Sequence, residues 1–105
     1  MTTEISRQPH RLIFFKKEQC GPCNEAMQYL NEVLEEHPEW HQHVVVLHKE
    51  NHNALVASYE LKIYPTVIIL DRNVDELARR VGISSVHKDW WEAALSAIHK
   101  LETSR

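Results

Sequence analysis

The residues of this chain with the clearest chemical potential are two cysteines, Cys20 and Cys23, separated by a glycine and a proline. They are the only cysteines among the 105 residues, and they lie between an apolar run and a helical pattern. Unsatisfied N–H groups and the dipole at a helix N-terminus stabilise a thiolate, which lowers the pKa of such a cysteine from about 8.5 towards about 7. The spacing therefore predicts that Cys20 is a nucleophile and that Cys23, one helical turn on, can displace a thiol bound to it.

The residues around the motif help to separate this interpretation from the alternatives. Gly21 permits a tight turn and the close approach of a partner chain, and Pro22 pre-sets the first helical turn without leaving an N–H unsatisfied. A Cys-x-x-Cys can also be half of a zinc site, but such sites usually have a second Cys or His pair at matching spacing. His41 and His43 flank a predicted strand start and keep a metal hypothesis open, although scattered histidines are usually solvated. We expect no metal, and no cofactor beyond a redox-active disulfide.

The elements that position the cysteines can be read from hydrophobic spacing. Residues 11–16 are short, apolar and partly β-branched, which predicts a buried strand directly before the motif. Residues 22–37 repeat apolar positions at intervals of three and four, which predicts an amphipathic helix that Pro38 ends. Residues 44–47 are too few for a helix and favour a second buried strand.

The second half of the chain predicts a helix, a hairpin and a final helix. Asn51 or Asn53 is expected to cap a short helix that ends at Tyr59. Residues 65–70 predict a strand that begins at a proline, and residues 71–74 predict a turn before a weaker strand near 77–81. Ser84 or Ser85 is expected to cap the last helix, whose apolar stripe comprises Trp91, Ala94, Leu95, Ile98 and Leu101. The predicted order is βαβαββα, an α/β fold with a central mixed sheet of about four strands flanked by helices.

Composition limits the classes of protein that this chain can represent. A hydrophobic fraction of 43% supports one domain over residues 1–105, with residues 1–10 as an N-terminal arm. The net charge of -3, with basic residues scattered among acidic ones, excludes a basic face for nucleic acid. No run approaches the roughly 18 apolar residues of a membrane span, and the first residues do not resemble a secretory signal. We expect a cytoplasmic protein that binds neither nucleic acid nor membrane.

Three features together resemble the thioredoxin family. Cys20-Gly21-Pro22-Cys23 follows an apolar strand, Tyr64-Pro65-Thr66 opens another strand, and Val81-Gly82 ends the hairpin. The resemblance covers roughly residues 12–101 and implies a thioredoxin-like fold. It also implies that Cys20 attacks a protein disulfide and that Cys23 resolves the mixed disulfide. The implied partners are protein disulfide substrates and a reductase that supplies electrons to a monomeric chain.

The resemblance also assigns the substrate groove. It implies that Pro65 is a cis proline facing the sulfurs, and that the backbone around Tyr64 pairs with an extended substrate segment as an added strand. Gly82 resembles the glycine that leaves room for the substrate beside the cysteines.

Several positions depart from the family's pattern. Gln19 stands where thioredoxins usually have Trp, and Phe14 stands where they have a buried Asp that helps to move the proton of the second cysteine. Tyr64 is bulkier than the aliphatic residue usual before the proline. The leading βα unit is expected to be shortened or absent.

The resemblance favours a protein-disulfide reductase, because reducing members of the family have Gly-Pro between the cysteines. Its reduction potential would lie near about -270 mV. Two alternatives remain. A glutaredoxin-like enzyme is disfavoured because residues 81–84 lack the acidic pair that glutaredoxins use to hold glutathione. A binding or redox-sensing module would dock a narrow partner through the surface around Trp90, Trp91 and Tyr64.

Overall fold

A computed structural model describes residues 9–104 of the chain. The strands and α-helices follow the predicted order, with three short 3-10 helices (η) between them. The elements are β1 (Arg11–Lys16), α1 (Gly21–Glu36), η1 (Pro38–His43), β2 (Val44–His48), η2 (Lys49–Asn51), α2 (Asn53–Ser58), β3 (Thr66–Leu70), β4 (Glu76–Val81), η3 (Ile83–Ser85) and α3 (Lys88–Thr103).

The four strands form one mixed sheet in the order β2-β1-β3-β4. Strand β1 pairs in parallel with β2 and antiparallel with β3, and β3 pairs antiparallel with β4. The parallel pair needs a crossover, which α1 supplies, whereas β3 and β4 are joined by a short turn. The predicted four-stranded α/β architecture is therefore confirmed.

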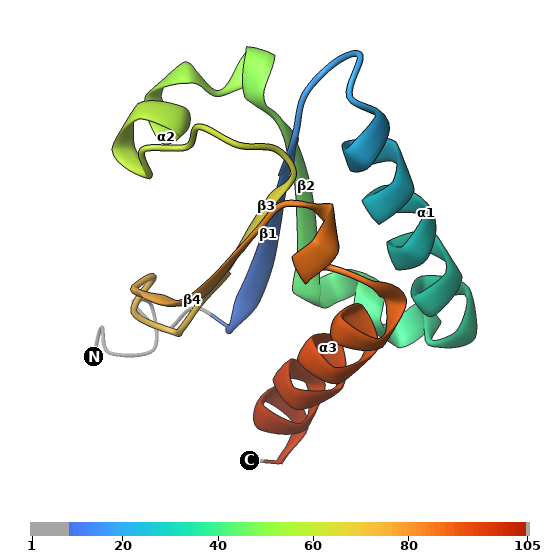
Figure 1. The fold of residues 1–105 in the computed structure, drawn as a ribbon. Helices are drawn as coiled ribbons and strands as arrows, with labels where there is room; N and C mark the ends of the chain where they lie inside the picture. Colours follow the sequence, from blue (N-terminus) through green and yellow to red (C-terminus); the bar gives the residue numbers. More distant parts are fainter. Residues whose placement is uncertain (1–8, 105) are drawn as a thin grey trace.

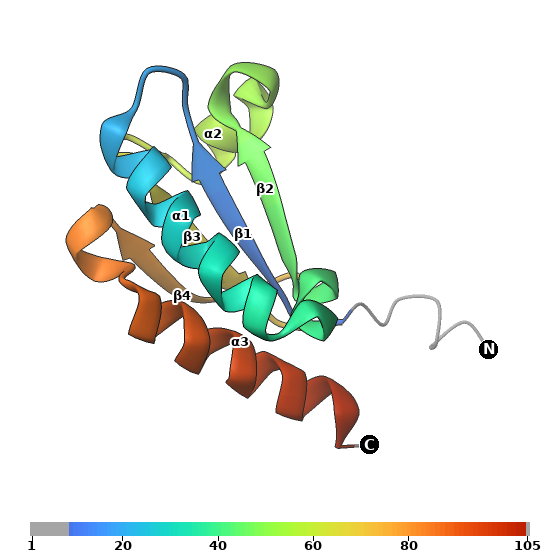
Figure 2. The same ribbon diagram turned by 90° about the vertical axis from the view of Figure 1, so that its right-hand side faces the viewer.

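The central strand β1 is buried on both faces of the sheet, as its uninterrupted apolar sequence predicts. Leu12 and Phe14 belong to the larger core, which lies between the sheet and the helices α1 and α3. Ile13 and Phe15 belong to a smaller core, which the short helix α2 and the segment after it cover. Figure 1 shows α1 and α3 on one side of the sheet and α2 on the other, and Figure 2 shows α1 and α3 in front of the strands.

Some sequence-based expectations about burial are wrong. Strand β2 is half-buried because it forms an edge of the sheet, although its β-branched residues predicted a buried strand. Leu101 was expected in the apolar stripe of α3, but half of it is exposed because it lies in the last turn of the helix. Trp91, Leu95 and Ile98 of that stripe are buried, as predicted.

The predicted capping residues are also wrong. The residue before α2 is His52, with Asn53 as the first helical residue, and no side chain caps this helix. Ser84 and Ser85 lie within η3, and α3 starts after His87, again without a side-chain cap. A 3-10 helix precedes each of these two helices, with one residue between η2 and α2 and two residues between η3 and α3.

Within residues 9–104, no strand or helix precedes β1. Most of the predicted N-terminal arm, residues 1–8, lies outside the described residues. None of the helices described is long and apolar enough to cross a membrane. The single-domain boundaries 1–105 stay a prediction.

Candidate active site

Cys20 is the residue that caps the N-terminus of α1. Its backbone is extended, with φ -126° and ψ 99°, and its carbonyl oxygen accepts a hydrogen bond from the N–H of Asn24 at 3.0 Å. Its sulfur takes the place of the usual capping oxygen, because the N–H of Cys23 donates to Cys20 Sγ at 3.1 Å. A thiolate at Sγ would therefore receive a hydrogen bond and lie at the positive end of the helix dipole.

The two cysteines form a disulfide in this structure, with their Cα atoms 5.2 Å apart. Cys23 is fully buried under the first turn of α1, whereas Cys20 retains 5% of its surface. An incoming disulfide would therefore reach Cys20 first. This difference in access agrees with the predicted roles of the two sulfurs.

The turn into the motif places Gln19 in the left-handed region, with φ 52°. Gln19 is exposed, as are Gly21 and Pro22 in the first turn of the helix. A Cβ at Gly21 would meet no atom within 4 Å, so the surface beside the sulfurs is open at this position.

The strand register brings three loops to the end of the sheet where the cysteines lie. Phe15 of β1 pairs with Thr66 of β3, and Thr66 pairs with Val81 of β4. The loop after β1, the loop before β3 and the residue after β4 therefore lie at the same end of the sheet. This end is the upper part of Figure 1, where the loop from β1 enters α1.

Pro65 and Gly82 lie together at this end of the sheet. The Tyr64–Pro65 peptide bond is cis, and Pro65 is fully buried. The N–H of Gly82 donates to the carbonyl oxygen of Pro65 at 2.8 Å. Gly82 has φ 86°, a conformation that favours glycine, and a Cβ there would meet no atom within 4 Å. The structure thus joins the two residues that the family resemblance assigns to the groove.

Tyr64 is half-buried, and its ring packs against the smaller core. Its hydroxyl is buried without a hydrogen-bond partner among the described residues, and burial, followed by the charge of Glu50, raises its pKa. The ammonium groups of Lys17 and Lys49 lie 5.9 and 5.6 Å from the centre of the ring. Lys49 was not predicted from the sequence, because it follows strand β2 and lies far from Tyr64 in the chain.

Phe14 and the two tryptophans belong to the packing of the fold. Phe14 is fully buried, and its ring meets that of Trp91 edge-to-face at 5.3 Å between centroids. Trp91 is fully buried, so the expected docking surface cannot include it. Trp90 is half-buried, with the guanidinium carbon of Arg80 5.8 Å from the centre of its ring.

Comparisons with known proteins identify the fold. No family model matches the chain, and no curated protein matches its sequence significantly. Solved structures do match: Fasciola hepatica thioredoxin has a TM-score of 0.69 and 16% identity over 90% of this chain and 85% of that one. The germline-specific thioredoxin Deadhead of Drosophila melanogaster has a TM-score of 0.65 and 20% identity, with the same two coverages.

Mitochondrial thioredoxin 3 of Saccharomyces cerevisiae, solved in its oxidised form, matches at a TM-score of 0.65 and 16% identity, covering 90% of this chain and 84% of that one. At these identities the comparison defines the fold and not the activity. The predicted thioredoxin-like fold is therefore confirmed. Together with the Cys20–Cys23 pair, this fold supports thiol–disulfide oxidoreductase chemistry in general.

Proposed function

We propose that this chain is a thioredoxin-like protein-disulfide reductase in which Cys20 is the nucleophile and Cys23 the resolving thiol. The observation that best supports the proposal is the hydrogen bond from the N–H of Cys23 to Cys20 Sγ at the start of α1. A helix N-terminus favours the thiolate, and the thiolate is the form that attacks a disulfide.

The proposed reaction begins with the reduced pair. Cys20 Sγ, as a thiolate, attacks one sulfur of a substrate disulfide; a new S–S bond forms, the substrate bond breaks, and the leaving thiolate takes a proton. Cys23 then loses its proton and attacks Cys20 Sγ, which releases the second substrate thiol. The substrate gains two electrons and two protons, and the chain ends with the Cys20–Cys23 disulfide. A dithiol reductase as electron donor would restore the reduced state.

We assign substrate positioning to the loops at the end of the sheet where the cysteines lie. Tyr64 and Pro65 would present backbone groups to an extended substrate segment, as in strand addition. Gly82, held to Pro65 by its N–H, would leave room for that segment. Ile63 and Val81, exposed by 58% and 40%, add apolar surface next to Thr66, which follows Pro65.

Phe14 gives the proposed reaction a distinctive weakness. Where thioredoxins have a buried Asp, this chain has an aromatic ring packed on Trp91. Cys23 must then lose its proton to water, to the substrate or to another group of the protein, so we expect the resolving step to be slower than in proteins with the carboxylate.

The proposal is tested by following the reduction of insulin by dithiothreitol with and without the protein. We expect a clear acceleration by the wild-type chain and none by Cys20→Ser. Cys23→Ser should accumulate a mixed disulfide with the substrate, because the second step is lost. A redox titration should give a potential at or below about -250 mV. No acceleration, together with a much more oxidising potential, would refute the proposal.

A binding or redox-sensing module is the second candidate, favoured by the exposed Ile63 and Val81, which line one surface hollow with Thr66. In that case Cys20→Ser would keep full biological activity. A glutaredoxin-like enzyme would instead need glutathione in the same assay. Protein substrates, a separate reductase, a monomeric state and a cytoplasmic location belong to the main proposal, because a reductase needs a reducing compartment.

A further inference from the structure

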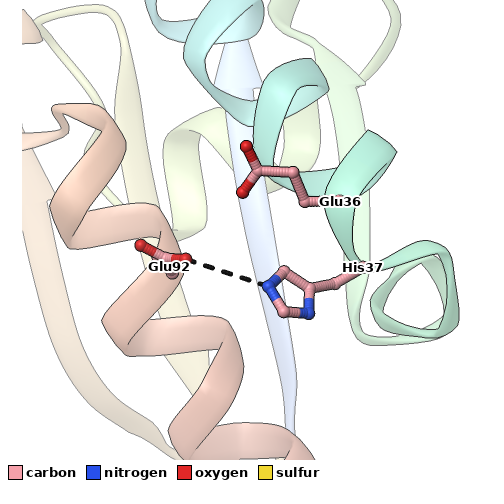
Figure 3. Close-up of side chains that lie close together, drawn as sticks. All are labelled: Glu36, His37 and Glu92. Carbon is pink, nitrogen blue, oxygen red and sulfur yellow. Dashed lines mark ion pairs between the residues drawn. The ribbon is translucent and has the colours of Figure 1, made fainter.

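A cluster of possible metal ligands lies at the end of α1 opposite the cysteines. Glu36 is the last residue of the helix, His37 follows it, and Glu92 lies in the first half of α3. The 16 residues of α1 separate this cluster from Cys20 by about 24 Å. One ligand atom from each residue lies within 4.8 Å of the other two. Figure 3 shows the three side chains converging between the two helices.

His37 is held in a fixed orientation at the centre of this cluster. Its ring stacks on Trp40, with 3.8 Å between centroids and 8° between planes. Its Nε2 lies 3.8 Å from a Glu92 oxygen, and its Nδ1 lies 3.8 Å from a Glu39 oxygen. These distances are too long for hydrogen bonds, so both ring nitrogens are without a hydrogen bond in the described part of the chain.

The charges around His37 favour an added cation. The C-terminal end of a helix is negative, but the last turn of α1 holds Glu35 and Glu36 and no basic residue. Lys88 is the one lysine or arginine among the described residues that pairs with carboxylates near this end of α1. Its Nζ lies 3.3 Å from a Glu36 oxygen and 3.7 Å from a Glu32 oxygen. Within residues 9–104, Glu39 and Glu92 form ion pairs with the His37 imidazole and with no Lys or Arg.

We propose that Glu36, His37 and Glu92 form a binding site for a divalent first-row metal ion such as Zn²⁺. One imidazole nitrogen and two carboxylate oxygens are a ligand set that zinc accepts, with water in the remaining position. Ligands about 2.1 Å from a tetrahedral ion lie about 3.4 Å apart, so the two carboxylates must close in by no more than about 1.4 Å. Both side chains are about half exposed.

Lys88 competes with the metal ion for Glu36. Binding would exchange the Lys88–Glu36 ion pair for a Glu36–metal bond, while Lys88 keeps its contact with Glu32. The alternative is an ordinary surface cluster in which Lys88 and His37 contact the carboxylates and no metal ion binds. The two cases differ in how a Lys88 variant behaves, because removal of a competing cation helps a metal site only if one exists.

The test titrates the full chain with ZnCl₂ at pH 7.5 by isothermal calorimetry. The Cys20–Cys23 pair is kept oxidised so that no thiolate binds the metal. We expect about one equivalent to bind, and we expect His37→Gln and Glu92→Gln to weaken binding by about tenfold or more. Lys88→Gln should tighten it. Zinc should also raise the melting temperature of the wild-type chain but not of the two weakened variants.

Matched controls separate this site from the other histidines and acidic residues of the chain. His41→Gln removes a neighbouring exposed imidazole, and Glu35→Gln removes a carboxylate from the same helical turn. Both should bind zinc like the wild type. The proposal is overturned by the absence of saturable binding, by wild-type affinity in His37→Gln and Glu92→Gln, or by an equal loss in His41→Gln. Failure here would leave the disulfide chemistry at Cys20 untouched.

Discussion

Nε2 of His43 lies 2.9 Å from Nδ1 of His99, which joins the end of η1 to the C-terminal half of α3. His43 is 3% exposed. Burial first, and His99 second, lower its pKa, although Glu102 acts in the opposite direction. One ring must donate and the other accept, so this pair cannot hold a proton on all four ring nitrogens without losing its hydrogen bond.

This pair predicts a loss of stability in mild acid. The unfolded chain takes up a proton at His43 near the ordinary pKa of about 6.5, whereas the folded chain does so only at lower pH. The stabilisation is therefore complete above pH 6.5 and is lost as the pH falls through the folded pKa. Thermal melts between pH 7.5 and 5.5 should show a smaller decrease for His43→Gln than for the wild type. An equal decrease in both would contradict the prediction.

Replacement of Gly82 should lower stability and weaken substrate binding although no atom blocks a side chain there. A Cβ at this position meets nothing within 4 Å, but the φ of 86° is strained for any L residue. Gly82→Ala should lower the free energy of unfolding by about 1–3 kcal/mol, because ψ is 156°, and should raise KM for a protein disulfide. The matched control is Gly21→Ala, which also meets no atom and lies in a helix, where alanine is favoured. It should leave stability unchanged or increase it, as chemical denaturation would show.

Val74 predicts a substitution that stabilises the chain. It has φ 67° in the turn between β3 and β4, where a β-branched residue is strained. Asp71 Oδ1 accepts the N–H groups of Asn73 and Asp75, which holds the turn in this form. Val74→Gly should raise the free energy of unfolding by about 1 kcal/mol. Val74→Ala keeps the Cβ and should gain much less; an equal gain would mean that exposure of the valine, and not its φ, is the cause.

Removal of the Tyr64 hydroxyl should increase the stability of the folded chain. It is buried without a hydrogen bond among the described residues, and such a group costs about 1–3 kcal/mol. Tyr64→Phe should therefore raise the urea concentration at the midpoint of unfolding. Tyr29→Phe is the control, because that hydroxyl donates to Glu25 on the surface and its loss should cost little or nothing. A destabilised Tyr64→Phe would reveal a partner for this hydroxyl.

The fold could be predicted from sequence where local patterns decide it. β1 coincides with its predicted range because four successive residues, Leu12 to Phe15, are buried. The Cys20 position at the start of α1 followed from Gly21 and Pro22. The burial of β2 could not be predicted, because whether Val44–His48 lies at an edge depends on which strands pair with β1.

The features missed at the site come from residues far apart in the chain. The Lys49 contact with the Tyr64 ring needs the turn after β2 to lie beside the loop before β3. His37 and Glu92 come together only through the packing of α1 on α3, and the pair of His43 and His99 spans 56 residues. A single sequence gives spacing along the chain, whereas these contacts depend on tertiary packing.

The unequal covering of the two faces of the sheet has a consequence for motion. One face is covered by two helices of 16 residues, and the other by α2, which has six residues and none buried. Backbone amides of α2 should therefore exchange with deuterium through local opening, while those of β1 exchange only when the whole chain unfolds. The loop to Pro65 follows α2 directly. We therefore expect a bound substrate segment to shift the Pro65 side of the groove more than Cys20, which starts a helix of 16 residues with five of them buried.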